Sequence, residues 1–209
     1  MQTPGPDLRE RRRLDTLKAV HDAAVALVRE SDLTSVTIDA MAARAGISRR
    51  TFFNYYATKE DAVLGTTAPV IPRAALEEFV DPHSGVDQFT RALSLIIATV
   101  QSTRGFDRTQ MSELRELIGR FPELRARLKQ HTAAAEALVE GVLIDHFSQE
   151  GTDLTKAGDS ARALLLLASA VLRFAYSRDP GVLTDAKGAA VTEAIEVFRE
   201  ALDGTVLCR

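Results

Sequence analysis

The side chains best suited to recognising another molecule are concentrated in residues 48–59. Ser48, Arg49, Arg50 and Thr51 follow one another directly, so two hydroxyl groups flank two guanidinium groups. Such groups donate hydrogen bonds to phosphate oxygens and to base edges in the major groove of DNA. Two cations at the start of a helix also oppose the helix dipole, which an anionic partner would offset. The cluster therefore predicts DNA binding.

Two short helices joined by a glycine turn would present this cluster. Thr37 suits the N-cap of the first helix, Gly46 suits the left-handed turn that ends it, and Ser48 suits the N-cap of the second. The first helix carries apolar residues at i, i+3, i+4 and i+7, namely Ile38, Met41, Ala42 and Ala45. We predict the second helix over residues 49–56. This is the helix-turn-helix arrangement, in which the start of the second helix reads the major groove.

A third helix is predicted over residues 58–68, with Thr58 as its N-cap. Lys59 lies in its first turn, where a cation opposes the dipole and a phosphate contact would explain it. Asn54 and Tyr55, on exposed faces of the preceding helix, are further candidates for DNA contact. Short helices with a glycine turn also occur in all-α proteins that never meet DNA, and paired arginines can simply be solvated. Three cations at helix starts, Arg49, Arg50 and Lys59, all suit an anionic partner and outweigh that alternative.

Residues 36–63 resemble the DNA-binding segment of the TetR-type (TetR/AcrR) family of bacterial transcriptional regulators. The shared pattern is a Thr start, Ala-Gly-Ile-Ser at the turn, Thr-aromatic-aromatic-X-Tyr-aromatic in the recognition helix, and then Lys-Glu. The resemblance implies an all-α homodimer. Its first three helices would bind a double-stranded DNA operator, and the remaining two thirds would bind a small molecule and dimerise.

The same resemblance implies roles by motif position. It places four side chains near bases and adjacent phosphates: Ser48, Arg49, Arg50 and Thr51. It places three more on the DNA backbone: Thr37, Tyr55 and Lys59. The family often has Tyr where this chain has Phe53, so a phenolic hydroxyl that usually reaches a phosphate is missing. We expect Asn54 or Tyr55 to take its place.

The charge distribution fits a DNA-binding end on an otherwise acidic protein. The net charge of the 209 residues is −3, yet residues 1–60 contain 10 Lys/Arg against 8 Asp/Glu. Four arginines stand in the first thirteen positions: Arg9, Arg11, Arg12 and Arg13. We predict that Arg12 and Arg13 belong to an arm that contacts phosphates or the minor groove, because local charge rather than global charge governs affinity for DNA.

Other chemistry has little support. The four histidines have neither paired cysteines nor clustered acids at metal-ligand spacing, so no metal and no cofactor is expected, and His21 is interpreted as a packed core residue. Cys208 is the only cysteine, and no local catalytic arrangement suggests an enzyme. The N-terminus does not resemble a signal peptide, and the longest apolar run is far shorter than the ~20 residues of a membrane span. A cytoplasmic protein without membrane association is expected.

The whole chain is predicted to be all-α, with about nine helices. Pro69 and Pro72 interrupt the helical pattern. They place the boundary between a helix-turn-helix DNA-binding domain, residues 1–68, and a ligand-binding and dimerisation domain, residues 69–209. The helix at 58–68 would be the only covalent bridge between them. Outside the DNA-binding motif, helices are expected at 9–30, 73–80, 86–103, 107–120, 122–149, 161–177 and 189–202.

The last two predicted helices are candidates for the dimer interface. The first of them is apolar on nearly every side, so it must be buried on more than one face, and TetR-like proteins usually dimerise through their last two helices. The predicted interface residues are Leu165, Val171, Leu172, Val191, Ile195, Phe198 and Leu202.

The middle helices of the larger domain are candidates for the ligand pocket. Apolar side chains there are mostly ordinary core, but bundles often hold ligands between helices, and the family resemblance implies a lipophilic one. The predicted lining is Phe89, Leu93, Ile97, Met111, Phe121 and Phe147. Residues 111–134 are also weakly similar to regulators proposed to sense acyl-CoA-type effectors. Four arginines could then meet phosphates or simply form a solvated face: Arg115, Arg120, Arg125 and Arg127.

These observations predict a transcriptional repressor that a lipophilic small molecule, acyl-CoA-like in one version, releases from a near-palindromic operator. The alternative is a helical small-molecule-binding protein or enzyme whose helix-turn-helix is only structural. An activator, or a repressor without a ligand, also remains open.

Overall fold

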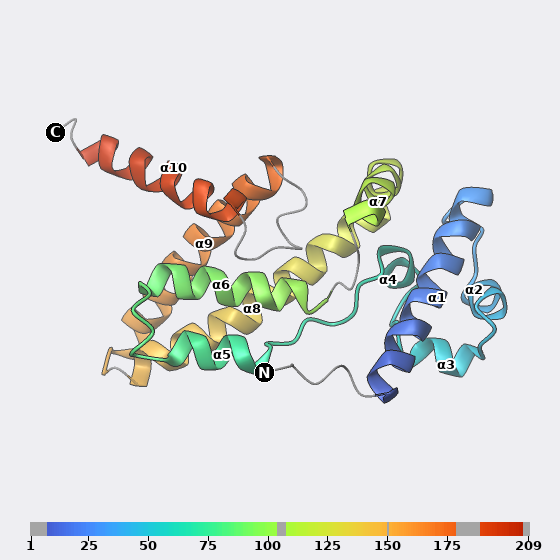
Figure 1. Ribbon diagram of the computed structural model, residues 1–209, viewed down its shortest axis with the longest axis horizontal. Helices are drawn as coiled ribbons and strands as arrows, with labels where there is room; N and C mark the ends of the chain where they lie inside the picture. Colours follow the sequence, from blue (N-terminus) through green and yellow to red (C-terminus); the bar gives the residue numbers. More distant parts are fainter. Residues whose placement is uncertain (1–7, 104–107, 150, 179–188, 207–209) are drawn as a thin grey trace. The chain divides into compact units, whose positions relative to one another are not determined.

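The computed structural model describes residues 8–103, 108–149, 151–178 and 189–206, and every regular element in these ranges is an α-helix. Ten helices are present in this part of the chain (Figure 1). They are α1 (Leu8–Glu30), α2 (Ile38–Arg44), α3 (Arg49–Phe53), α4 (Lys59–Leu64), α5 (Arg73–Val80), α6 (Gln88–Gln101), α7 (Arg108–Arg120), α8 (Pro122–Gln149), α9 (Leu154–Arg178) and α10 (Ala189–Val206). The predicted all-α class is confirmed.

The helices form two compact units, and the chain passes between them more than once. The first unit holds the chain up to Ala68 together with residues 112–131, and the second holds Pro69–Thr103 and the chain from Thr132 onward. The expectation that residues 58–68 are the only covalent bridge is therefore wrong. The long helix α8 contributes its beginning to the first unit and its remainder to the second.

The first unit is built on α1, which packs against α2 and α4. Its buried face consists of Val20, His21, Ala23, Ala24 and Val28. His21 is 5% exposed, and its Nδ1 lies 2.9 Å from the carbonyl oxygen of Ala62. The interpretation of His21 as a core residue is thus confirmed.

The recognition helix α3 is shorter than predicted. It ends at Phe53 because the backbone tightens there: the N–H groups of Asn54 and Tyr55 bond carbonyls three residues back, at 3.1 and 2.9 Å. The following Thr58 is extended, as an N-cap requires. Tyr56 remains buried outside the helix, and its hydroxyl donates to the carbonyl of Leu17 at 3.0 Å. Burial raises the pKa of this phenol.

Helix α4 is also shorter than predicted, ending at Leu64 instead of residue 68. Gly65 follows with φ 61° and ψ 32°, a left-handed conformation that glycine adopts without steric cost. The glycine therefore ends this helix before the prolines at 69 and 72 are reached.

The second unit has its own core, formed where α6 packs on α5 and α9 and where α9 packs on α10. Helix α9 begins seven residues earlier than predicted, after Asp153, whose carboxylate accepts the N–H of Thr155 at 3.0 Å. Helix α10 extends to Val206, past the predicted end at 202. By length and composition alone α9 could cross a membrane, as core helices of soluble proteins also can, and its buried residues belong to this core.

Candidate nucleic-acid interface

The two arginines that begin α3 are both exposed, but their surroundings differ. The Nη1 of Arg49 donates to the Oδ2 of Asp39 on α2 at 2.7 Å, and its guanidinium lies 5.6 Å from the ring centroid of Phe53. Within the described ranges Arg50 has no hydrogen bond or ion pair. No described residue therefore holds Arg50 away from a base edge, whereas a DNA contact by Arg49 would require exchange of its contact with Asp39.

The predicted hydroxyl contacts are used as helix caps. The Oγ1 of Thr37 accepts the N–H of Ala40 at 3.2 Å, and the Oγ of Ser48 accepts the N–H of Thr51 at 3.0 Å. The hydroxyls of Ser48 and Thr51 also lie 2.8 Å apart. A hydroxyl that accepts in this way keeps its own proton to donate, so capping is compatible with a phosphate contact.

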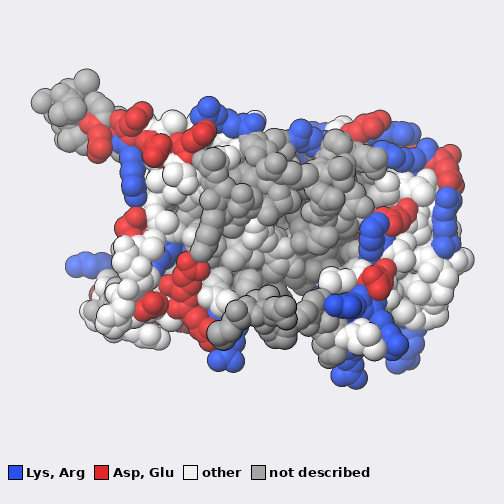
Figure 2. Space-filling model, in the orientation of Figure 1, with Lys and Arg blue, Asp and Glu red and all other residues white. Residues whose placement is uncertain are grey.

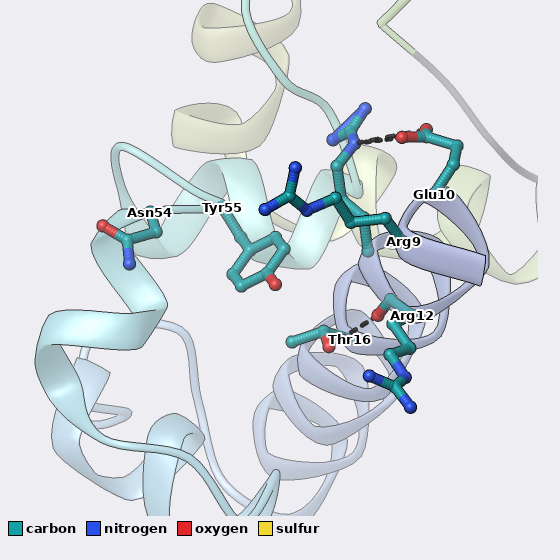
Figure 3. Close-up of a pocket in the computed structure, with 7 residues that line it drawn as sticks. Arg9, Glu10, Arg12, Thr16, Asn54 and Tyr55 are labelled. Carbon is teal, nitrogen blue, oxygen red and sulfur yellow. Dashed lines mark hydrogen bonds and ion pairs between the residues drawn. The ribbon is translucent and has the colours of Figure 1, made fainter. Parts of the chain in front are cut away.

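Residues from two elements converge beside the end of α3. A surface pocket of about 570 Å³ lies between the first turns of α1 and the segment after α3. Its lining is Arg9, Glu10, Arg12, Arg13, Thr16, Asn54 and Tyr55. Figure 3 shows Tyr55 directed toward α1. The sequence predicted four of these as DNA contacts (Arg12, Arg13, Asn54 and Tyr55), and the structure brings them together; Arg9 and Thr16 were not predicted.

Lys59 has a structural task in the same unit. Its Nζ donates to the carbonyl oxygens of Leu33 at 2.7 Å and of Val36 at 3.3 Å. The ammonium group thus ties the start of α4 to the segment that precedes α2. Its predicted phosphate contact stays a prediction.

Asp61, in the first turn of α4, is the centre of a buried polar cluster that the sequence did not predict. Its carboxylate oxygens accept from the Nε and Nη2 of Arg127, both at 2.7 Å, and its Oδ1 lies 2.6 Å from the Nε2 of His131. The same residue forms a capping box with Thr58. Burial alone would raise the pKa of this carboxyl, but hydrogen bonds from His131, Arg127 and Thr58 outweigh it and lower the pKa to about 2.

This cluster was missed because its members are about 70 positions apart. No local spacing links Asp61 to Arg127 and His131 on α8, although Thr58 and Asp61 stand at capping-box distance. Arg127, considered in the sequence as a phosphate contact or a solvated residue, is instead half-buried in an ion pair.

The predicted ligand-pocket residues divide between the two units. Leu93 and Ile97 are buried in the core of the second unit, and Phe89 and Phe147 pack against it. Phe121 is buried in the first unit. The side chain of Met111 lies outside the described residues, and a pocket formed by this set stays a prediction.

The predicted dimer residues mostly face the core of their own chain. Leu165, Val171 and Val191 are buried, and three more are partly buried against the same core: Leu172, Ile195 and Phe198. Leu202 lies outside the described side chains. Exposed large apolar side chains on the described parts of the same two helices are Leu154 and Leu166 on α9 and Val197 on α10. Any partner must contact such exposed positions first.

The surface of the first unit carries cationic side chains beside the helix-turn-helix. Lys and Arg side chains gather on the surface where α1 begins and α3 lies (Figure 2). Among the described residues no group of three or more His, Cys, Asp or Glu side chains is arranged to hold a metal ion. The site therefore consists of donors to an anion, presented by a helix-turn-helix.

Together, the capped α2, the turn at Gly46 with φ 70° and the exposed start of α3 define a helix-turn-helix DNA-binding protein. Residues 20–64 match the family described as "Bacterial regulatory proteins, tetR family". This match covers the helix-turn-helix and supports a DNA-binding transcriptional regulator of the TetR family. It has no significant match among curated proteins.

Proposed function

We propose that this regulator is a cytoplasmic homodimeric repressor that a small molecule releases from a near-palindromic operator. The observation that carries the proposal is the guanidinium of Arg50 on the exposed start of α3, which bonds no other described residue and follows the N-cap Ser48. Paired copies would set two such helices in successive major grooves, about 34–36 Å apart. The protein would regulate rather than catalyse.

The effector is proposed to be lipophilic and to bind in the second unit. Support comes from the apolar side chains of α6 and α8 and from the family resemblance. An effector of this kind would lower DNA affinity by a coupling of ~1–3 kcal/mol. The acyl-CoA-like version has weaker support, because Arg127 is held in an ion pair with Asp61.

The test is selection of genomic fragments by the purified protein, followed by binding titrations on the recovered sites. The expected result is a set of near-palindromes bound by a dimer. Recovery of no site, together with failure to bind random duplex even at low salt, would overturn the proposal.

The alternative, a small-molecule-binding protein or enzyme with a purely structural helix-turn-helix, is distinguished by retention on heparin. A DNA-binding protein is retained at low salt and released sharply near physiological salt, because counterion release drives its binding. A structural motif gives no such retention.

A further inference from the structure

The pocket between α1 and the end of α3 has a composition suited to a phosphate group. Its lining contains three guanidinium groups, those of Arg9, Arg12 and Arg13, and one carboxylate, that of Glu10. The phenol of Tyr55, the amide of Asn54 and the hydroxyl of Thr16 complete the lining (Figure 3). Guanidinium, phenol and amide groups donate hydrogen bonds in several directions to the oxygens of a tetrahedral anion, whereas the hydroxyl of Thr16 already donates to the carbonyl oxygen of Arg12 at 2.8 Å.

The arginines of this pocket differ in how they are engaged. Arg13 donates from its Nε to both carboxylate oxygens of Glu10, at 3.2 and 3.3 Å. The side chains of Arg9 and Arg12 make no hydrogen bond to any other described residue. Two cations are therefore unneutralised, while the third shares its charge with the only acid of the pocket.

We propose that this pocket, the α1–α3 pocket, binds one backbone phosphate of duplex DNA through Arg9 and Arg12, and that Glu10 limits the affinity by retaining Arg13. The inference rests on the proposed function. The position of the pocket supports DNA over a free metabolite as its ligand. Asn54 and Tyr55 directly follow the recognition helix, so a DNA strand beside α3 passes this surface. The pocket is also open, and a small anion in an open site stays well hydrated.

A shared phosphate has a signature that separate contacts lack. The slope of log affinity against log salt changes by about 0.9 for each phosphate neutralised on duplex DNA. The substitutions are present in both protomers of the dimer. If Arg9 and Arg12 hold the same phosphate in each protomer, Arg9→Gln together with Arg12→Gln reduces the slope by about 1.8. If they hold two phosphates in each protomer, the reduction is about 3.6.

The experiment measures anisotropy titrations of the full chain on a selected site and on a scrambled duplex over a salt series. Arg9→Gln and Arg12→Gln should each weaken both duplexes about tenfold, because phosphate contacts carry no sequence information. Glu10→Gln should strengthen both several-fold. Arg73→Gln is the matched control, since Arg73 is an exposed arginine that pairs with Glu77 in the second unit.

The possible results are distinguishable. Wild-type binding with variants that all behave like Arg73→Gln overturns the pocket and leaves the proposed function standing. Failure of the wild type on every duplex removes both. Calorimetry with inorganic phosphate and pyrophosphate, without DNA, forms the last arm: saturable binding that Arg12→Gln abolishes, with DNA titrations that Arg12→Gln leaves unchanged, would identify a metabolite site and overturn the assignment to DNA. Unchanged thermal melts of these exposed variants confirm that folding is intact.

Discussion

At the scale of single residues, the two neighbouring arginines of the recognition helix differ in their contacts within the protein. Arg50 is free among the described residues, whereas Arg49 is paired with Asp39 at 2.7 Å. Both partners of that pair are more than half exposed, so its contribution to stability is small. Its importance is for the predicted recognition, because Asp39 would compete with DNA for Arg49.

Substitution of Arg50 tests base recognition directly. Arg50→Ala should weaken binding to the selected site by about 1–3 kcal/mol and flatten the preference for it over a scrambled duplex. Tyr55→Phe is the contrast, since loss of a backbone contact should weaken both duplexes equally. Parallel titrations on the two duplexes measure the effect. An unchanged specificity ratio for Arg50→Ala would show that Arg50 takes no part in base recognition.

Lys59 has a structural role and a predicted phosphate contact, which a binding assay alone would confuse. Lys59→Met keeps the length of the side chain but removes the bonds to the carbonyls of Leu33 and Val36, so the free energy of unfolding should fall by about 1–3 kcal/mol. Binding should weaken on all duplexes if the ammonium also meets a phosphate. Urea unfolding and DNA titration of the same variant separate the effects: reduced stability with intact affinity would leave Lys59 a purely structural role.

At the scale of elements, α4 depends on a partner far along the chain. The helix has six residues, and its N-terminal capping box is held by α8 through Asp61, Arg127 and His131. A helix this short gains little from its own hydrogen bonds, so tertiary contacts must stabilise it. The buried carboxylate supplies such a contact.

The pKa of Asp61 gives this contact a defined pH dependence. The folded-state pKa of about 2 lies below the ordinary value of 3.8, so the ionised carboxylate stabilises the fold above pH 3.8, and this stabilisation is lost as the pH falls through 2. Linkage gives on the order of 2 kcal/mol. Asp61→Asn should therefore lower the free energy of unfolding by about 2–3 kcal/mol at neutral pH, and much less near pH 2.

Urea unfolding at several pH values measures the difference between Asp61→Asn and the wild type. Asp39→Asn is the control, because Asp39 is exposed and its loss should change the stability only slightly. A difference for Asp61→Asn that stays constant from about pH 7 to pH 2 would contradict the assigned ion pair.

Elements were predicted correctly from the sequence where local signals are sufficient. Caps at Thr37, Ser48 and Thr58 and the turn at Gly46 depend on neighbouring residues only, and the bounds of α5 and α8 were predicted correctly. The end of α4 was misplaced because prolines were given more weight than Gly65. Contacts such as Asp61 with Arg127 require the tertiary fold, and periodicity carries no signal for them.

At the scale of the whole molecule, the two compact units do not follow the domain boundary that the prolines suggested. Residues 112–131 belong to the same compact unit as the helix-turn-helix, and α8 continues without interruption into the second unit. The DNA-binding unit is therefore completed by sequence distant from its motif. An isolated fragment ending at residue 68 would lack Arg127 and His131 and leave Asp61 without two of its partners.

In the proposed function, operator binding depends on dimerisation, a property of the whole molecule. Leu165 is 4% exposed and its substitution would damage the core, but the adjacent Leu166 is 53% exposed on α9. Leu166→Glu should thus leave the fold intact and disrupt pairing, because a charge buried in an apolar interface lacks a partner. Val80→Glu on α5, with Val80 47% exposed, is the matched control.

Sedimentation should give a dimer for the wild type and Val80→Glu and a monomer for Leu166→Glu at micromolar concentration. The monomer should bind a full palindrome at least tenfold more weakly, because the second half-site no longer binds at a high effective concentration. A dimeric Leu166→Glu variant with normal melting would place the interface away from this part of α9, and a monomeric wild type would remove the homodimer itself. Equal affinity of monomer and dimer for the palindrome would show that each copy reads its half-site independently.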